Sequence, residues 1–196
     1  MQDTVRLYTR QNEKTLAELE RTGRLLNRKI YVRLHFGPCW EIFMDAYEWF
    51  TETASEIIPK PDDAELPIWC TVNPDTCLKA IPGTLVYVLD VPKDHIIYFD
   101  EARWDYVLNY HYVAENEADE RDYRKHLDAI GVSDGFQFFH GKYKGFYPEE
   151  VERIRESWKR VFSVDTESCP FLCANLWEIK KEWIVRVVRP GEPLTE

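Results

Sequence analysis

The sequence predicts an α+β fold of a single domain, in which small mixed or antiparallel sheets pack with several amphipathic helices. The 196 residues are about the length of one domain. Aromatic residues make up 14% of the chain, which is enough for a large aromatic core. Short apolar runs typical of strands are interspersed with stretches whose apolar residues recur every three or four positions, as they do in helices.

Short runs of apolar, β-branched and aromatic residues predict the strands. These runs cover residues 5–9, 68–72, 84–91, 95–99, 171–179 and 183–188. The run 84–91 is almost wholly apolar, which is typical of a strand buried on both faces. The residues after the last run, 189–196, are rich in proline and charge and predict a frayed C-terminal tail.

Helical periodicity is clearest in the segment that begins at Gly37-Pro38. Its core-facing stripe is expected to contain Trp40, Phe43, Met44 and Tyr47. An acidic stripe, Glu41, Asp45, Glu48 and Glu52, is expected on the opposite face. Further helices are predicted between the first strand and Gly23, after Asp100, and from Pro148. Residues 131–147 show no clean period and predict an ordered irregular loop or a hairpin around Gly141.

The formal charge of −10 and the pI near 5.1 make nucleic acid a poor expected partner and favour a basic protein partner. No apolar run is long enough to cross a membrane, and residues 1–20 lack the apolar core of a secretory signal. The five cysteines fit reduced thiols, and neither they nor the histidines have metal-ligand spacing. We therefore expect a cytoplasmic, metal-free protein, whose oligomeric state the sequence leaves open.

Several polar or aromatic residues stand where packing does not require them, and these are the candidate ligand-binding residues. The set consists of Tyr8, Thr9, Gln11, Trp69, Asp100, Asn109 and Asn175. Thr9 and Gln11 lie where the first strand ends, and loops at strand ends often carry binding groups. Trp69 offers a flat face for stacking, and Asn175 interrupts an apolar strand with an amide that needs partners. Alternative interpretations are that Asp100 is an N-cap and that Trp69 belongs to the core. In the same way, Gln11 could lie at the surface and Asn175 could bond to a neighbouring loop.

A series of segments in order resembles a bacterial and phage-associated family catalogued as a domain of unknown function. They include Leu7-Tyr8-Thr9-Arg10-Gln11, Leu66-Pro67-Ile68-Trp69, Trp104-Asp105-Tyr106-Val107-Leu108-Asn109 and Ala174-Asn175-Leu176-Trp177-Glu178-Ile179. The resemblance runs from about residue 5 to about residue 188. It implies no settled activity, so whether the protein is an enzyme is left open.

The order of elements is also similar to the plan of ADP-ribosyltransferase-like proteins. That resemblance implies a cleft that holds NAD between two small sheets, with Tyr8, Thr9 or Arg10 on the first strand. It also implies a glutamate on a late strand, where this chain has Asn175. An amide cannot replace the carboxylate that stabilises positive charge on the ribose. Altered or lost catalysis would follow.

Two functions are predicted. The first is an aromatic cleft that binds a nucleotide-like ligand of the NAD or ADP-ribose type, in a diverged ADP-ribosyltransferase relative. The alternative is a non-enzymatic acidic interaction protein, an inhibitor or antitoxin-like factor, that binds a basic protein. The catalytic residues remain unknown, and NAD is the cofactor that the resemblance implies.

Overall fold

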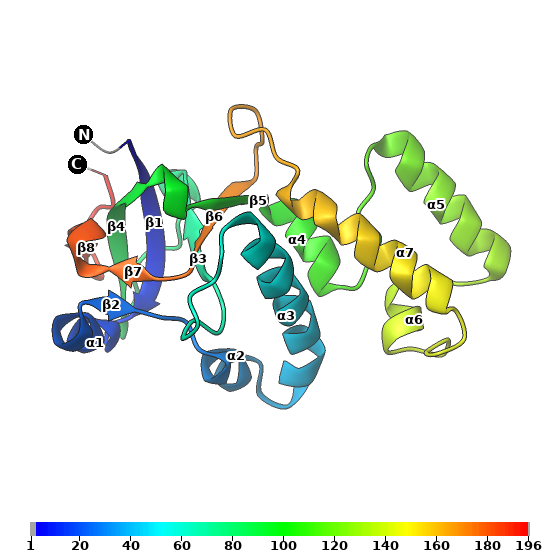
Figure 1. Cartoon of the computed structure of the whole chain (residues 1–196), viewed down its shortest axis with the longest axis horizontal. Helices are drawn as coiled ribbons and strands as arrows, with labels where there is room; N and C mark the ends of the chain where they lie inside the picture. The colour runs from blue at the N-terminus through cyan, green and yellow to red at the C-terminus, as the bar shows by residue number, and fades with distance from the viewer. Residues whose placement is uncertain (1–2, 196) are drawn as a thin grey trace. The chain divides into compact units, whose positions relative to one another are not determined.

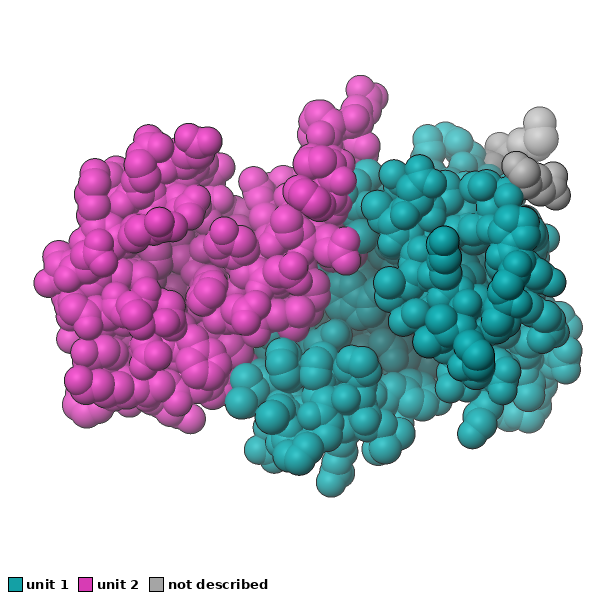
Figure 2. All heavy atoms as spheres, turned by 180° about the vertical axis from the view of Figure 1, so that it is seen from behind, with its two compact units in different colours: residues 1–98, 172–196 teal, residues 99–171 magenta. Residues whose placement is uncertain are grey.

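A computed structural model describes residues 3–195, which divide into two compact units. Unit 1 comprises residues 3–98 and 172–195, and unit 2 comprises residues 99–171 (Figure 2). Unit 2 is therefore inserted into the chain of unit 1, between one strand and the next. Within residues 3–195, no helix combines the length and the apolar character that a membrane span requires.

The centre of unit 1 is a six-stranded sheet with the order β5-β6-β3-β1-β4-β8 (Figure 1). Its strands are β1 (Thr4–Asn12), β3 (Ile68–Thr71), β4 (Thr84–Pro92), β5 (Ile97–Asp100), β6 (Leu172–Leu176) and β8 (Ile184–Val188). A two-stranded ribbon is formed by β2 (Arg24–Leu25) and β7 (Ile179–Lys180). The pairs β1–β3, β1–β4, β3–β6, β4–β8 and β2–β7 are antiparallel. The predicted α+β class is confirmed.

Strand β4 forms the middle of the core, as its continuous apolar run predicted. It pairs with β1 from Thr4↔Pro92 to Asn12↔Thr84, and Tyr87 is fully buried. Because side chains alternate along a strand, Tyr87 and Leu89 join the cluster on one face, whereas Val86 and Val88 join the other. Burial on both faces explains why this run contains almost no polar residues.

The helices of unit 1 are α1 (Thr15–Thr22), α2 (Lys29–Phe36) and α3 (Trp40–Ile57). Helix α1 packs Leu19 into the core and ends at Gly23, whose positive φ of 77° is the left-handed conformation that glycine allows. Helix α2 was not predicted. Its sequence, KIYVRLHF, has a helical period too short to stand out, and it follows an arginine without a capping side chain.

The predicted core stripe of α3 is only partly correct. Met44 is buried, but Trp40, Phe43 and Tyr47 are half-buried. The fully buried side chains are Ala46, Phe50 and Ala54, of which Phe50 and Ala54 lie farther along the helix. The reason is that the first half of α3 packs against the short helix α2, where Phe36 and Phe43 stack at 4.0 Å, and one short helix cannot enclose it.

Unit 2 is helical, with α4 (Glu101–Leu108), α5 (Glu117–Ile130), α6 (Phe136–Phe139) and α7 (Pro148–Trp158). Its core is aromatic: Trp158 stacks on Phe139 at 5.6 Å, and Tyr110 packs edge-on against Trp158. The polar run at residues 115–122 starts α5, and Asn116 caps it by accepting from Ala118 N. Residues 131–147 contain the single-turn helix α6, not a hairpin.

The C-terminal residues 189–195 have no regular secondary structure. Leu194 packs against the cluster that contains Tyr8 and Val88. Arg186 on β8 donates to the carbonyl oxygens of Pro193, at 2.8 Å, and Leu194, at 3.3 Å. These contacts attach the tail to the sheet.

Candidate functional site

Unit 1 has a cleft of about 700 Å³ where β1 ends. This volume lies within the range of about 300–1,000 Å³ that small-molecule sites occupy. The cleft is lined by Arg10, Gln11, Asn12, Lys14, Thr15, Glu18, Leu25, Leu26, Asn27, Tyr31, Leu34, His35, Ile68 and Trp69. Two of the predicted ligand-binding residues, Gln11 and Trp69, are among them.

One wall of the cleft is the junction between β1 and α1. Asn12 forms the turn between them: its Oδ1 accepts from Lys14 N at 3.0 Å, and its carbonyl oxygen accepts from Thr15 Oγ1 at 2.6 Å. The Thr15 hydroxyl also lies 2.8 Å from the Tyr87 hydroxyl on β4. The turn therefore fixes Lys14 and Thr15 against the rigid sheet.

The other wall is the segment from Leu25 to α2. Leu25 and Leu26 are buried and form an apolar surface, whereas Tyr31 is 50% and Leu34 is 73% exposed. Asn27 donates from Nδ2 to Pro67 O at 2.8 Å, so its side chain is oriented by the segment that precedes β3. An exposed aromatic ring and an exposed leucine therefore lie beside an apolar surface.

The charges in the cleft differ from those of the chain as a whole. Arg10 and Lys14 line the cleft, and within residues 3–195 neither forms an ion pair. Alternation along β1 places Arg10 on the face of Tyr8, where its Nη1 donates to Lys79 O at 3.4 Å. Burial raises the pKa of the Cys77 thiol on this face, and the charge of Arg10 opposes this larger effect. Of the described lining residues, Glu18 alone carries a carboxylate. Burial raises the pKa of the neighbouring Tyr87 hydroxyl, so this group is neutral near pH 7. The site thus presents two cations in a chain of net charge −10: Lys14, whose ammonium has no hydrogen bond or ion pair among residues 3–195, and Arg10, which donates to Lys79 O.

The predicted residues of β1 form a small hydrogen-bonded group. Thr9 is 3% exposed; its Oγ1 donates to Trp69 O at 2.7 Å and accepts from Gln11 Nε2 at 2.8 Å. Thr9 thus fixes the side chain of Gln11 at the cleft without lining it. Tyr8 lies on the opposite face of β1, in the cluster with Val86 and Val88.

Trp69 and Asn175 are direct cross-strand partners on β3 and β6. Ile68, Cys70, Ala174 and Leu176 belong to the core cluster that contains Leu7, so alternation places Trp69 and Asn175 on the other face of the sheet. Thr9 and Gln11 lie two and four residues after Leu7 and therefore share its face of the sheet. Thr9 and Gln11 thus lie on one face and Trp69 and Asn175 on the other, so the sheet separates Asn175 from Gln11.

The Trp69 ring packs against α3. It meets Tyr47 edge-on at 5.7 Å and Phe50 at 4.9 Å, so much of its predicted stacking surface is occupied. Asn175 is fully buried; its Nδ2 donates to Ile68 O at 3.4 Å, and its Oδ1 has no hydrogen-bond partner among residues 3–195. Asn175 does not line the cleft.

Asp100 and Asn109 lie in unit 2, at the two ends of α4. Asp100 is the N-cap, and its Oδ1 accepts from Ala102 N at 2.9 Å and Arg103 N at 3.2 Å. Asn109 is exposed and donates to Asp105 O at 2.8 Å, at the C-terminal end of the same helix. Both side chains therefore satisfy backbone groups at the ends of their own helix.

Several residues of the cleft were not predicted. The sequence did not indicate helix α2, which carries Tyr31 and His35 and follows Asn27. For the short helix α1, the sequence pattern indicated only the residues that face the core, so the side with Lys14, Thr15 and Glu18 was not predicted. A polar Asn12-Glu13-Lys14-Thr15 segment next to the candidates Thr9 and Gln11 was the available signal.

Two other predictions concern groups outside the cleft. None of the five cysteines forms a disulfide, and residues 3–195 contain no group of three or more His, Cys, Asp or Glu placed to hold a metal ion. In the acidic stripe of α3, Glu48 forms an ion pair with Lys29, whereas Glu41 and Glu52 are exposed.

A family model described as Domain of unknown function (DUF3841) matches residues 6–185. No curated protein and no solved structure matches the chain. The family match covers both units. The function must therefore be inferred from the geometry of the site.

Proposed function

We propose that this chain, which belongs to the family Domain of unknown function (DUF3841), binds a small anionic ligand of the nucleotide type in the cleft of unit 1. The observation that carries the proposal is the pair Arg10 and Lys14, two cations that line the cleft of a strongly acidic chain and form no ion pair among residues 3–195. A phosphate or diphosphate group is the anion that such a pair suits best, because charge-assisted hydrogen bonds to cations are the strong ones.

The neutral groups of the cleft support a ligand with sugar hydroxyls and a ring. Amides at Gln11, Asn12 and Asn27 can donate and accept, which fixes the orientation of a polar ligand. Tyr31, half-exposed, is the ring available for stacking, in place of Trp69, which α3 already covers. NAD and ADP-ribose combine the required anion, hydroxyls and flat base.

Transferase chemistry on NAD would require a carboxylate at another position than that of Asn175, where the resemblance implied one. Cleavage of the nicotinamide bond requires a carboxylate near the ribose. Asn175 is buried beyond the cleft, and Glu178 forms ion pairs with Arg24 and Lys180. Glu18, beside Thr15 in the cleft, is the carboxylate we propose for this role in a diverged ADP-ribosyltransferase relative.

A thermal-shift screen against NAD, ADP-ribose, AMP and inorganic phosphate tests the binding proposal. A ligand at 100 times its Kd stabilises the folded state by about 2.7 kcal/mol, which raises the Tm of a chain of this length by about 5–10 °C. We expect such a shift with ADP-ribose or NAD. The variants Arg10→Gln and Lys14→Gln should weaken binding about tenfold or more, because each removes a charged hydrogen-bond donor.

Lys181→Gln is the matched control, since it removes the same charge from an exposed lysine of unit 1 outside the cleft. It should leave the shift unchanged. Equal losses in Lys14→Gln and Lys181→Gln would mean that net charge alone attracts the ligand. If wild-type protein binds none of the four probes, the proposal fails and the acidic interaction protein becomes the better prediction. Loss of NAD hydrolysis in Glu18→Gln, with binding retained, would support the transferase role.

A further inference from the structure

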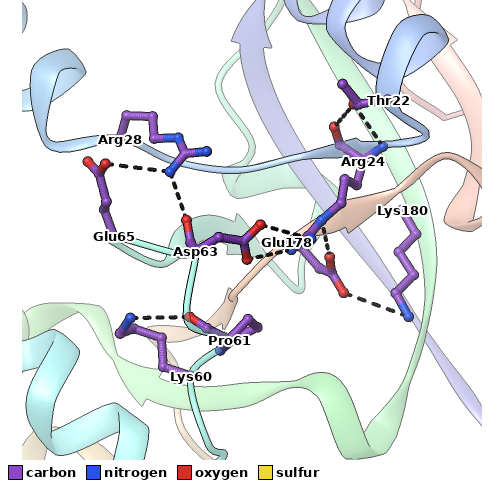
Figure 3. A network of polar contacts seen from close by, with 9 residues as sticks. All are labelled: Thr22, Arg24, Arg28, Lys60, Pro61, Asp63, Glu65, Glu178 and Lys180. Carbon is purple, nitrogen blue, oxygen red and sulfur yellow. Dashed lines mark hydrogen bonds and ion pairs between the residues drawn. The ribbon is translucent and has the colours of Figure 1, made fainter.

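We infer that Arg24 and Arg28 are positioning residues, which hold one wall of the cleft in place and thereby set its affinity for ligand. Together with Asp63, Glu65 and Glu178 they form an ionic clamp (Figure 3). The inference rests on the proposed function, since it concerns the affinity of that same cleft. None of the five clamp residues lines the cleft, but Leu25, Leu26 and Asn27 between the two arginines do.

Arg24 connects three segments that are distant in the sequence. Its Nη1 and Nη2 donate to the two carboxylate oxygens of Asp63 at 3.1 and 3.2 Å, and its Nε lies 2.7 Å from Glu178 Oε2. The backbone of Arg24 also pairs with Lys180 on β7. The bidentate ion pair restrains both the distance and the relative orientation of the Arg24 guanidinium and the Asp63 carboxylate. It therefore fixes the direction of the backbone at Arg24, where the segment that forms the cleft wall begins.

Arg28 and Glu65 fix the start of α2. Arg28 Nη1 donates to Asp63 O at 2.7 Å and approaches Glu65 Oε1 at 3.5 Å. Glu65 Oε2 accepts from Lys29 N at 2.8 Å. Helix α2 has no side-chain cap of its own, so Glu65 satisfies one of its free N–H groups from outside and complements the positive end of the helix.

The clamp determines where the ligand-facing residues of α2 lie. Tyr31, Leu34 and His35 follow Arg28 within two turns, so rotation of the helix start would move all three. Apolar packing beneath α2 is modest: Val32 joins Met44 and Leu66 in a small cluster. Val32 is the one buried residue of α2, and Phe36 adds a half-buried stacking contact with Phe43. We infer that so short a helix depends on its ionic attachments as well for its position.

The clamp is also sensitive to salt. The side chain of Asp63 is 56% exposed and that of Glu65 is 43% exposed, so water and ions screen their charges. Exposed ion pairs are individually weak, and the loss of two corresponds to a change in equilibrium of about 3- to 10-fold. A change of this size is enough to alter the affinity of the cleft for ligand without unfolding unit 1.

The test uses the full-length double variant Asp63→Asn, Glu65→Gln, which keeps the shape of both side chains. Asp90→Asn is the matched control, because it removes the ion pair between Arg6 and Asp90 in the six-stranded sheet of the same unit, away from the clamp. Amide hydrogen exchange of residues 25–36 is measured without ligand in all three proteins. The Kd for ADP-ribose is measured by calorimetry at about 50 and 300 mM NaCl, which spans a large change in screening.

In the double variant, exchange in residues 25–36 should accelerate about 3- to 10-fold, and the Kd should rise by a similar factor at low salt. The control should match the wild type in both. Unchanged exchange in residues 25–36, acceleration spread equally over the whole chain, or an unchanged Kd despite local acceleration would each overturn the inference. Absence of ADP-ribose binding by wild-type protein would instead overturn the proposed function, while the exchange data would still decide whether the clamp positions the wall.

Discussion

Asn175 contains a buried amide whose Oδ1 has no hydrogen-bond partner among residues 3–195. Among residues 3–195, its side chain forms one hydrogen bond, to Ile68 O, which is long at 3.4 Å. A buried polar group without a full set of partners destabilises the folded state by about 1–3 kcal/mol. The amide therefore contributes little to stability, and its position outside the cleft gives it no contact with a ligand there.

We expect Asn175→Leu to leave the free energy of unfolding within about 1 kcal/mol of wild type or to increase it, because the unsatisfied oxygen is removed at similar volume. Asn175→Asp should lower it by several kcal/mol at about pH 7, because it buries an unpaired charge. Urea unfolding measures both. Loss of ligand-induced stabilisation in a well-folded Asn175→Leu protein would show that Asn175 takes part in binding after all.

The apolar stripe of helix α3 is well packed in the second half of the helix and only partly packed in the first half. Phe50 is fully buried in the core and contacts Trp69. Phe43 is half-buried and stacks on Phe36 of α2. The hydrophobic contribution of a ring scales with the apolar area removed from water. The two phenylalanines of one helix should therefore differ in their effect on stability.

Phe50→Ala should lower the free energy of unfolding by about 3–5 kcal/mol, as expected for a fully buried ring. Phe43→Ala should lower it by about half as much, since less area is buried and the site can collapse. Chemical denaturation of the two variants, with equal m-values, checks the comparison. Equal losses would indicate that α2 and α3 together enclose Phe43 as completely as the main core encloses Phe50.

At the scale of the whole molecule, buried phenols and thiols make stability depend on alkaline pH. Burial raises the pKa of Tyr47, Tyr87, Tyr123 and of the thiols of Cys70 and Cys77. In the unfolded chain these groups ionise near their ordinary pKa values, about 10 for tyrosine and about 8.5 for cysteine. Because the folded state keeps them protonated, their contribution is complete below about pH 8 and is lost as pH rises.

We therefore expect the free energy of unfolding, measured in urea, to fall between about pH 8 and pH 10.5. Tyr123→Phe should make this decline shallower, since it removes one of the buried phenols. Tyr106→Phe, at a 43% exposed phenol in the same unit, is the control and should follow the wild type. A decline in Tyr123→Phe as steep as that of wild type would exclude Tyr123 as a source of the pH dependence.

The prediction of a single domain concerns cooperativity between the two compact units. Strand β5 crosses the boundary between them: Tyr98 belongs to unit 1, and Phe99 to unit 2. A strand that begins in one unit and ends at the capped helix of the other favours joint unfolding. We expect one urea transition, with the exchange protection of β4 and α7 lost at the same midpoint. Separate midpoints would identify two domains that unfold independently.

The sequence by itself determined the elements whose signals are local. The continuous apolar run of β4, the Asp100 cap and the Gly23 helix end were all predicted, because each depends on residues within a few positions of one another. The α+β class followed from the same patterns. Gln11 and Trp69, two of the residues proposed from the sequence, both line the cleft at the end of β1, although a role in binding stays a prediction.

Only the tertiary structure decided which side chains share a face of the sheet and which cations in the cleft lack a carboxylate partner. Register places Trp69 opposite Asn175, and a shift of one residue would have reversed both faces. The availability of Arg10 and Lys14 depends on where the carboxylates of distant segments lie, as does the clamp between Arg24, Asp63 and Glu178. These contacts join residues 39 to 154 positions apart, and local sequence patterns do not record pairings at such separations.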